Sequence, residues 1–150
     1  MAMPVAQTWS RLLAAAWLGA LLAVALIGTP APFALLARAE AGEVAGRMLA
    51  HEATLSLLLG VVVAMIERHR ARQRAVAGQG SQFSAGMALA LGALFCTVLG
   101  YYALQPMMAE ARAGLGRFGF AQLHAVSTAF YGLKVVLVAV LAWRAASSPD

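Results

Sequence analysis

Charged residues are scarce in this 150-residue chain, at 11% of the sequence, while hydrophobic residues make up 62%. A soluble globular domain has about a quarter of its residues charged and about half apolar, so this composition excludes that class. Aromatic residues are also few, at 8%. In a soluble protein the net charge of +5 would suggest a nucleic-acid partner. Here we expect no nucleic acid, and we expect the basic residues to face the anionic leaflet of a lipid bilayer.

Cysteine is almost missing. The single Cys96 excludes a disulfide framework and a cysteine-based metal motif. It repeats with Gly92 and Gly100 at four-residue spacing, which predicts a face of small residues suited to close helix packing. Motifs of nucleophilic hydrolases, phosphate-binding loops and zinc hydrolases are also missing from the sequence, and we expect no enzymatic activity.

Four long apolar stretches account for nearly the whole sequence. They run over about 11–36, 44–67, 83–108 and 118–144, and each supplies the roughly 20 residues that a membrane-spanning helix needs. The sequence therefore predicts an all-α, integral membrane bundle of four transmembrane helices forming a single domain, 1–150.

The first apolar stretch has two other features that bear on this prediction. Ala37-Arg38-Ala39 resembles a signal-peptide cleavage site, but the apolar run continues to Leu36, which favours a retained helix. Pro30 and Pro32 near its end remove backbone donors, which indicates either a polar pocket at that level or a plain kink.

Arginines in the short connections predict the orientation. One side of the membrane receives the segment after the second helix together with Arg11 and Arg144, six basic residues in all: Arg11, Arg68, Arg70, Arg72, Arg74 and Arg144. The other side receives four: Arg38, Arg47, Arg112 and Arg117. We therefore expect a bacterial inner-membrane protein with both termini and the 67–82 loop in the cytoplasm. That loop is a topology determinant or, alternatively, a site for anionic lipid.

Polar residues form stripes on three of the predicted helices, and such stripes usually face a bundle interior. The second helix carries Glu52 and Ser56 with His51 and Met48, the third Thr97, Tyr101 and Gln105, and the fourth His124, Ser127, Tyr131 and Lys134. We predict that they converge on one site in the outer half of the bundle. The candidate binding residues are His51, Glu52, Gln105, His124, Ser127 and Lys134.

Two of these residues, Glu52 and Lys134, are expected at similar depths in the membrane. At a rise of ~1.5 Å per residue, Lys134 lies ~15 Å and Glu52 ~22 Å above the cytoplasmic edge. A lysine side chain spans most of that difference, and either charge alone in hydrocarbon would tend to neutralise. The sequence therefore predicts an ion pair between them. It leaves open whether the pair is functional or a structural staple.

Histidine and methionine near the outer ends indicate a second kind of site. His51, His124, Met48 and Met107 are of the ligand types found in copper and haem centres, although no metal-binding spacing joins them. The alternative is that the histidines form hydrogen bonds between helices and the methionines fill the core.

Several segments resemble a bacterial family, domain-of-unknown-function 4149. They are Pro32-Phe33-Ala34-Leu35-Leu36, Arg38-Ala39-Glu40-Ala41-Gly42, Ala45-Gly46-Arg47, Leu104-Gln105-Pro106-Met107-Met108 and Phe120-Ala121-Gln122-Leu123-His124-Ala125-Val126-Ser127. That family is similar to eukaryotic transmembrane protein 205 and distantly to copper-resistance D-type membrane proteins. The resemblance implies a four-helix membrane protein and no defined activity.

Three functions remain open from the sequence. The first is a binding or transport-type protein that uses the predicted outer site. The second is an accessory subunit that packs against other membrane protein subunits. The third, a copper or haem binding protein, is a narrower form of the first.

Overall fold

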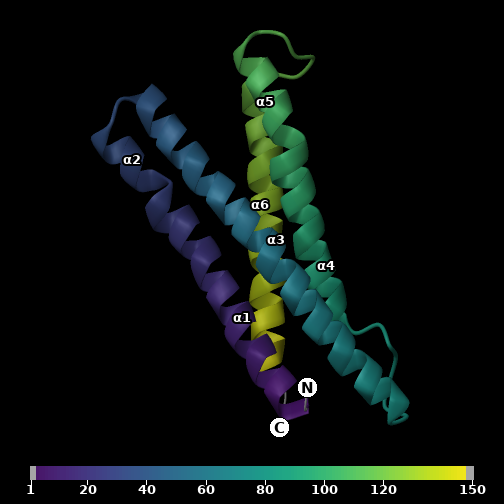
Figure 1. Ribbon diagram of the computed structural model, residues 1–150. Coiled ribbons are helices and arrows are strands. Elements are labelled where there is room, and N and C mark those ends of the chain that lie inside the picture. Colours follow the sequence, from purple (N-terminus) through teal and green to yellow (C-terminus); the bar gives the residue numbers. More distant parts are fainter. Residues whose placement is uncertain (1–2, 148–150) are drawn as a thin grey trace.

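A computed structural model describes residues 3–147. Within that part of the chain every regular element is helical (Figure 1). The elements are α1 Met3–Ala23, η1 Val24–Gly28, α2 Pro30–Leu35, α3 Arg38–Val76, α4 Ala85–Thr97, η2 Val98–Ala103, α5 Leu104–Arg112 and α6 Phe120–Ser147. They form four helices long and apolar enough to cross a membrane: Val5–Leu35, Arg38–Val76, Ala85–Arg112 and Phe120–Ser147. The predicted all-α bundle of four transmembrane helices is confirmed.

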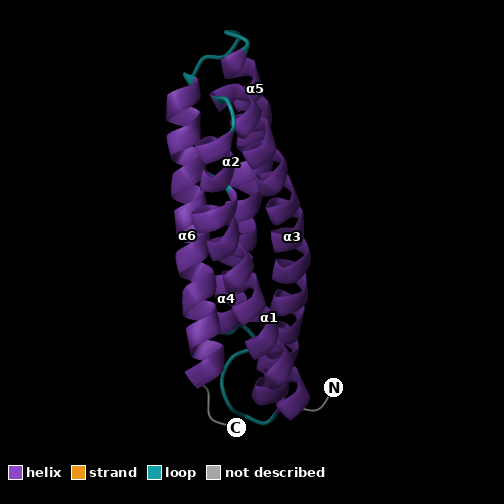
Figure 2. Cartoon of the chain, turned by 90° about the vertical axis from the view of Figure 1, so that its left-hand side faces the viewer, coloured by secondary structure: helices purple, strands orange, loops and turns teal. Residues whose placement is uncertain are grey.

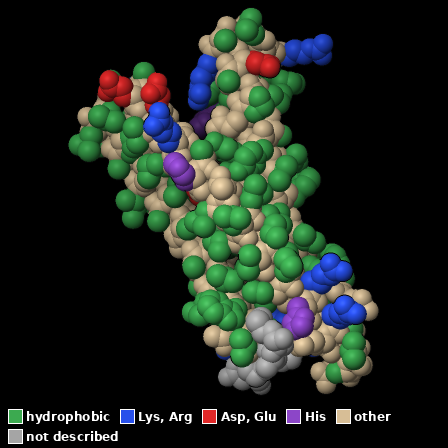
Figure 3. Space-filling model, viewed as in Figure 1, with side chains coloured by type: hydrophobic (Ala, Val, Ile, Leu, Met, Phe, Trp, Pro, Cys, Tyr) green, Lys and Arg blue, Asp and Glu red, His purple; other side chains and the backbone are tan. Residues whose placement is uncertain are grey.

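Figure 2 shows the four helices running lengthwise beside one another, with the loops confined to the two ends. Helix α1 begins and α6 ends at the same end of the bundle (Figure 1). Charged side chains gather towards the two ends, and hydrophobic side chains cover the band between them (Figure 3). This distribution is what a bilayer requires, because charges are costly in hydrocarbon and favourable at the headgroups.

Glycines and a serine cap set the turns. Gly78 and Gly80 have φ of 73° and 95° in the loop after α3, a backbone conformation that glycine adopts without steric cost. The Oγ atom of Ser84 accepts a hydrogen bond of 3.1 Å from the backbone N–H of Met87 and so caps α4. Short turns of this kind keep consecutive helices antiparallel.

The second helix extends beyond the predicted transmembrane bounds, 44–67, at both ends. Helix α3 runs from Arg38 to Val76, and the arginine-rich segment that we expected to be a loop forms its last turns. Hydropathy marks where a helix leaves hydrocarbon, whereas arginine, glutamine and alanine favour helix in water as well. The loop itself is therefore limited to the residues between α3 and α4.

Two π-helical stretches, η1 and η2, interrupt the first and third spans at points that periodicity did not predict. In the first span the Thr29 N–H donates to the carbonyl of Val24 at 2.8 Å, and the Thr29 hydroxyl donates to Ala25 at 3.0 Å. Pro30 and Pro32 then form the first turn of α2, where their missing N–H groups break no helix hydrogen bond. The prolines therefore begin the last helical segment of the first span.

The helices pack most closely at the end of the bundle where α1 begins and α6 ends. There α1, α3, α4 and α6 form a ring in which each helix packs against two others. The fully buried centre of this ring includes Trp17, Leu21, Val63, Val138 and Leu141. At the far end, α2 packs on α3 while α5 packs on α6, and the two pairs diverge as separate arms (Figure 1).

The small-residue face of the third span packs against α6, as the spacing predicted. Cys96 is buried, and a Cβ atom on Gly92 would lie 3.2 Å from Leu137. A Cβ atom on Gly100 would lie only 2.5 Å from the Cβ of Phe130. Glycine at position 100 is therefore required for this distance between the helices.

Candidate functional site

Glu52 on α3 and Lys134 on α6 form an ion pair inside the bundle. The Lys134 Nζ atom lies 2.8 Å from Glu52 Oε1 and 3.0 Å from Oε2, and each side chain is only 3% exposed. The predicted ion pair is thus confirmed. Both carboxylate oxygens face the ammonium group, so each charge has its counter-charge in a region without water to solvate it.

A hydrogen-bond network surrounds the pair and ties three helices together. The Ser56 hydroxyl donates to Glu52 Oε1 and accepts a hydrogen bond of 2.8 Å from Trp17 Nε1. The Lys134 Nζ atom lies 4.6 Å from the ring centroid of Tyr131, a cation–π contact. The Tyr131 hydroxyl in turn donates to the carbonyl of Leu21 at 2.8 Å. Trp17 is the member of this network that the sequence stripes did not include.

An open cleft of about 640 Å³ lies between the arms, on the side of α3 that faces η2 and α5. Its lining combines small, charged and hydrogen-bonding residues: Gly42, Glu43, Gly46, Arg47, Ala50, Tyr101, Gln105 and Arg112. The divergence of the two arms is visible as a notch in Figure 3. Ala50 lies two residues before Glu52 on α3, and the lining of the cleft includes neither Glu52 nor Lys134.

The other predicted site residues lie apart from the ion pair. Gln105 lines the cleft, and the Ser127 hydroxyl donates to the carbonyl of Gly100 at 2.6 Å, which holds α6 against η2. His51 is exposed, with Nδ1 2.9 Å from the carbonyl of Arg47 on its own helix. His124 is exposed and stacks on Phe120 at 5.7 Å between centroids. The structure thus joins two of the six predicted residues directly and leaves the binding role of all six a prediction.

The residues considered for copper or haem show no common centre. The Met48 side chain packs at Gly28, where its methyl group occupies the space that a Cβ atom would need. Met107 is half-buried in α5. Among residues 3–147, no three histidine, cysteine or acidic side chains gather in a group that could hold a metal ion.

A second buried charged cluster lies at the opposite end of α3, and the sequence reasoning missed it. Glu67 Oε1 accepts hydrogen bonds of 2.6 Å from Ser10 Oγ and 2.6 Å from Arg70 Nη1. Glu67 is the last residue of the predicted span 44–67, yet both Glu67 and Arg70 are buried. The sequence did contain a signal for this cluster. Glu67 lies on the helix face that Glu52, Ser56 and Gly60 share, about four turns after Glu52.

Comparison with known proteins identifies the family. The sequence profile of the family described as Domain of unknown function (DUF4149) matches residues 12–117. The chain belongs to this family. No curated protein and no solved structure matches the chain. The part that matches the DUF4149 family includes Glu52, the lining of the cleft and Glu67, and it ends before α6, which supplies Lys134.

Proposed function

We propose that this DUF4149 protein is a binding or transport-type membrane protein whose ligand occupies the cleft between the arms. The observation that carries the proposal is an open volume of about 640 Å³ with a charged and hydrogen-bonding lining, in a bundle that also holds a buried ion pair. Ligand sites in proteins have volumes of about 300–1,000 Å³. Ionisable side chains within a transmembrane bundle are expensive to keep, and they mark ligand or ion pathways.

The lining of the cleft matches a small amphiphilic molecule with a polar group. Arg47, Arg112 and Glu43 place charges at its mouth, while Tyr101 and Gln105 offer hydrogen bonds further in. Gly42, Gly46 and Ala50 on the α3 wall are small, so a ligand can approach the helix backbone closely beside them. A polar group that reached Glu52 and Lys134 would meet both signs of charge in a region of low dielectric constant, where such contacts are strong.

The orientation proposed from the arginine distribution places the cleft on the periplasmic side of a bacterial inner membrane. Both termini then lie in the cytoplasm. The site needs no catalytic step in this role, and we propose binding without chemistry.

Filling the cleft tests the proposal. A side chain at Gly46 would extend into open space, and so would one at Gly19, which is exposed on α1 away from the cleft. We expect native mass spectrometry after extraction into nanodiscs to show a bound small molecule with the wild type and with Gly19→Trp. Gly46→Trp should lack it. Equal retention by both variants would contradict the proposal.

The same spectra distinguish the other two functions. A protein that co-purifies with the wild type and is lost only from Gly46→Trp would show that the cleft receives a subunit. A copper or haem mass that persists in Gly46→Trp but disappears when both His51 and His124 are replaced by alanine would favour a metal or haem carrier. In either case the proposed small-molecule site would be wrong.

A further inference from the structure

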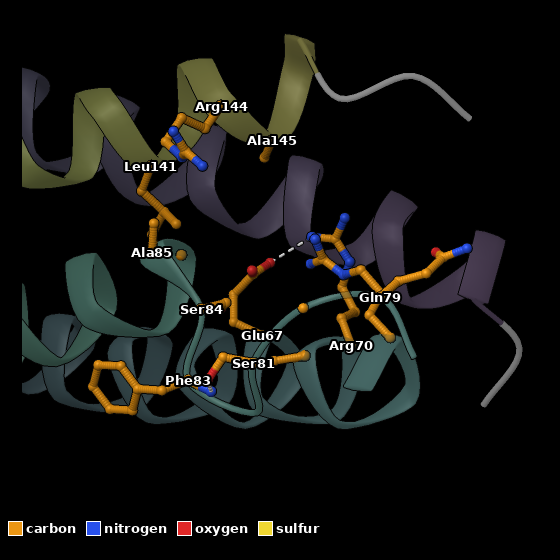
Figure 4. A pocket seen from close by; sticks show the side chains of 14 residues that line it. Glu67, Arg70, Gln79, Ser81, Phe83, Ser84, Ala85, Leu141, Arg144 and Ala145 are labelled. Atoms are coloured by element: carbon orange, nitrogen blue, oxygen red, sulfur yellow. Dashed lines mark hydrogen bonds and ion pairs between the residues drawn. The ribbon is translucent and has the colours of Figure 1, made fainter. Parts of the chain in front are cut away.

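The second buried cluster opens into a pocket of about 230 Å³ at the end of the bundle opposite the cleft (Figure 4). The end of α3, the loop, the start of α4 and the end of α6 enclose it. Its lining is Glu67, Arg70, Ala71, Arg74, Gln79, Gly80, Ser81, Phe83, Ser84, Ala85, Gly86, Leu141, Arg144 and Ala145. We name it the arginine pocket, because Arg70, Arg74 and Arg144 all line it.

The charges in the arginine pocket do not balance. Three arginines line it, and Glu67 is the single acidic residue of the lining, so basic residues outnumber acidic ones there. Glu67 is already held by Arg70 and Ser10. Figure 4 shows Glu67 and Arg70 facing one another, with Arg144 coming from α6 on another wall. Arg70 is buried, Arg74 is half-buried and Arg144 is exposed, so positive charge extends from the interior of the pocket to its mouth and attracts an anion.

Hydrogen-bond donors in the pocket also lack acceptors. The Nε atoms of Arg70 and Arg74 are buried and have no hydrogen-bond partner, and Arg70 as a residue is only 6% exposed. Arg70 uses Nη1 on Glu67, which leaves its Nε and Nη2 edge for a second acceptor. An unsatisfied buried donor destabilises a protein by about 1–3 kcal/mol, so the native state is expected to supply a partner.

The start of α4 adds a third feature that favours an anion. Ser84 caps the helix. Its side-chain hydroxyl accepts a hydrogen bond from the N–H of Met87, and its carbonyl accepts one from the N–H of Ala88. The first two amides of the helix, at Ala85 and Gly86, point out of its N-terminus beside the pocket. The positive end of the helix dipole therefore adds to the potential of the arginines.

We propose that the arginine pocket binds a phosphate group, carried either by the head group of an anionic phospholipid or by soluble phosphate. A guanidinium edge binds phosphate oxygens in a bidentate manner, which matches the donors that Arg70 and Arg74 leave open. The pocket lies where α3 leaves its apolar span, at headgroup depth. Phe83 lines it and is 61% exposed, so it offers an apolar surface beside the phosphate site, as the glycerol region of a lipid requires.

Arg74→Gln is the test variant, because Arg74 lines the pocket without holding Glu67. Arg72→Gln is the matched control: it removes the same charge from the same helix, but Arg72 is exposed and outside the pocket. Each protein is placed in nanodiscs of phosphatidylcholine alone or of equal parts phosphatidylcholine and phosphatidylglycerol. Native mass spectrometry then counts retained phosphatidylglycerol, and calorimetry with inorganic phosphate in the phosphatidylcholine discs measures the soluble ligand.

We expect Arg74→Gln to weaken binding of the phosphate-bearing ligand by about tenfold, the loss of one charge-assisted contact, and Arg72→Gln to weaken it several-fold less. Retention of phosphatidylglycerol identifies a lipid site, and binding of inorganic phosphate alone identifies a soluble one; both support the pocket. Equal effects of the two variants, or no binding of either ligand, would overturn the proposal. Thermal unfolding of Arg74→Gln in detergent checks that the variant still folds.

Discussion

Glu52 and Lys134 meet because two helices carry opposite charges at similar depth, and each needs the other in hydrocarbon. With Ser56 and Trp17 the pair forms a network in which every strong donor or acceptor has a partner. Such a network specifies how α1, α3 and α6 are rotated about their axes, since any other rotation would leave a buried charge alone. The pair is thus a structural determinant of the bundle.

Removing one charge of the pair should destabilise the protein more than removing both charges. Glu52→Gln or Lys134→Met leaves one buried charge without its counter-charge, and we expect each to lower the free energy of unfolding by about 3–5 kcal/mol. The double variant should recover part of the loss, because the interaction and its desolvation cost disappear together. Unfolding of the three variants in micelles measures this. Strictly additive effects would mean that the two residues do not interact in the membrane.

At the scale of the elements, the third span depends on its small-residue face. Gly92, Cys96 and Gly100 bring α4 and η2 close to α6, and the Ser127 hydroxyl fastens the contact by its hydrogen bond to the Gly100 carbonyl. The π-helical stretch η2 adds a residue to one turn and so changes which side chains face the cleft beyond it. Tyr101 and Gln105 line the cleft for this reason, while Thr97 is buried and bonds to its own helix.

Gly100→Leu should destabilise this contact. The new side chain would collide with Phe130, and overpacking costs about 1–3 kcal/mol. Gly132→Leu is the control: Gly132 is exposed on α6 with open space around it, and leucine there should be neutral or stabilise the helix by up to about 1 kcal/mol. Thermal unfolding in micelles compares the two. A Gly100→Leu protein as stable as the control would show that this face does not pack against α6.

At the scale of the whole molecule, the two ends differ. One end is a closed ring of four helices with a buried core and the arginine pocket, and the other opens into two arms around the cleft. A bundle closed at one end and open at the other has a defined direction across the membrane. That direction decides from which side a ligand enters the cleft.

Reporter fusions determine the direction. Because the six basic residues at the closed end exceed the four at the open end, a reporter inserted at Gly80 should show a cytoplasmic location and one inserted at Gly114 a periplasmic location. Both glycines have positive φ in exposed turns, so an insertion disturbs no helix. The reverse result at both positions would place the cleft on the cytoplasmic side and would contradict the proposed orientation.

Sequence alone was sufficient for the fold class and for the ion pair. Long apolar runs can satisfy their backbone groups in hydrocarbon as helices, which fixes the four spans. Two opposite charges at similar depth, each unfavourable alone, fix their pairing. The tight face at Gly92, Cys96 and Gly100 followed from their four-residue spacing, although Gly100 lies in the π-helical stretch η2.

The tertiary structure decided the rest. Spacing places residues on a face of a helix but does not say which neighbour that face meets, and the π-helical stretches shift the register where the sequence gives no sign of it. His124 is exposed, although it shares a helix face by spacing with the buried Lys134, and His51 beside the buried Glu52 is exposed as well. Arg70 and Glu67 are buried because α3 continues beyond its apolar span, and the loop and the end of α6 close over it. Burial of a charge depends on what packs around it, and that is a property of the whole bundle.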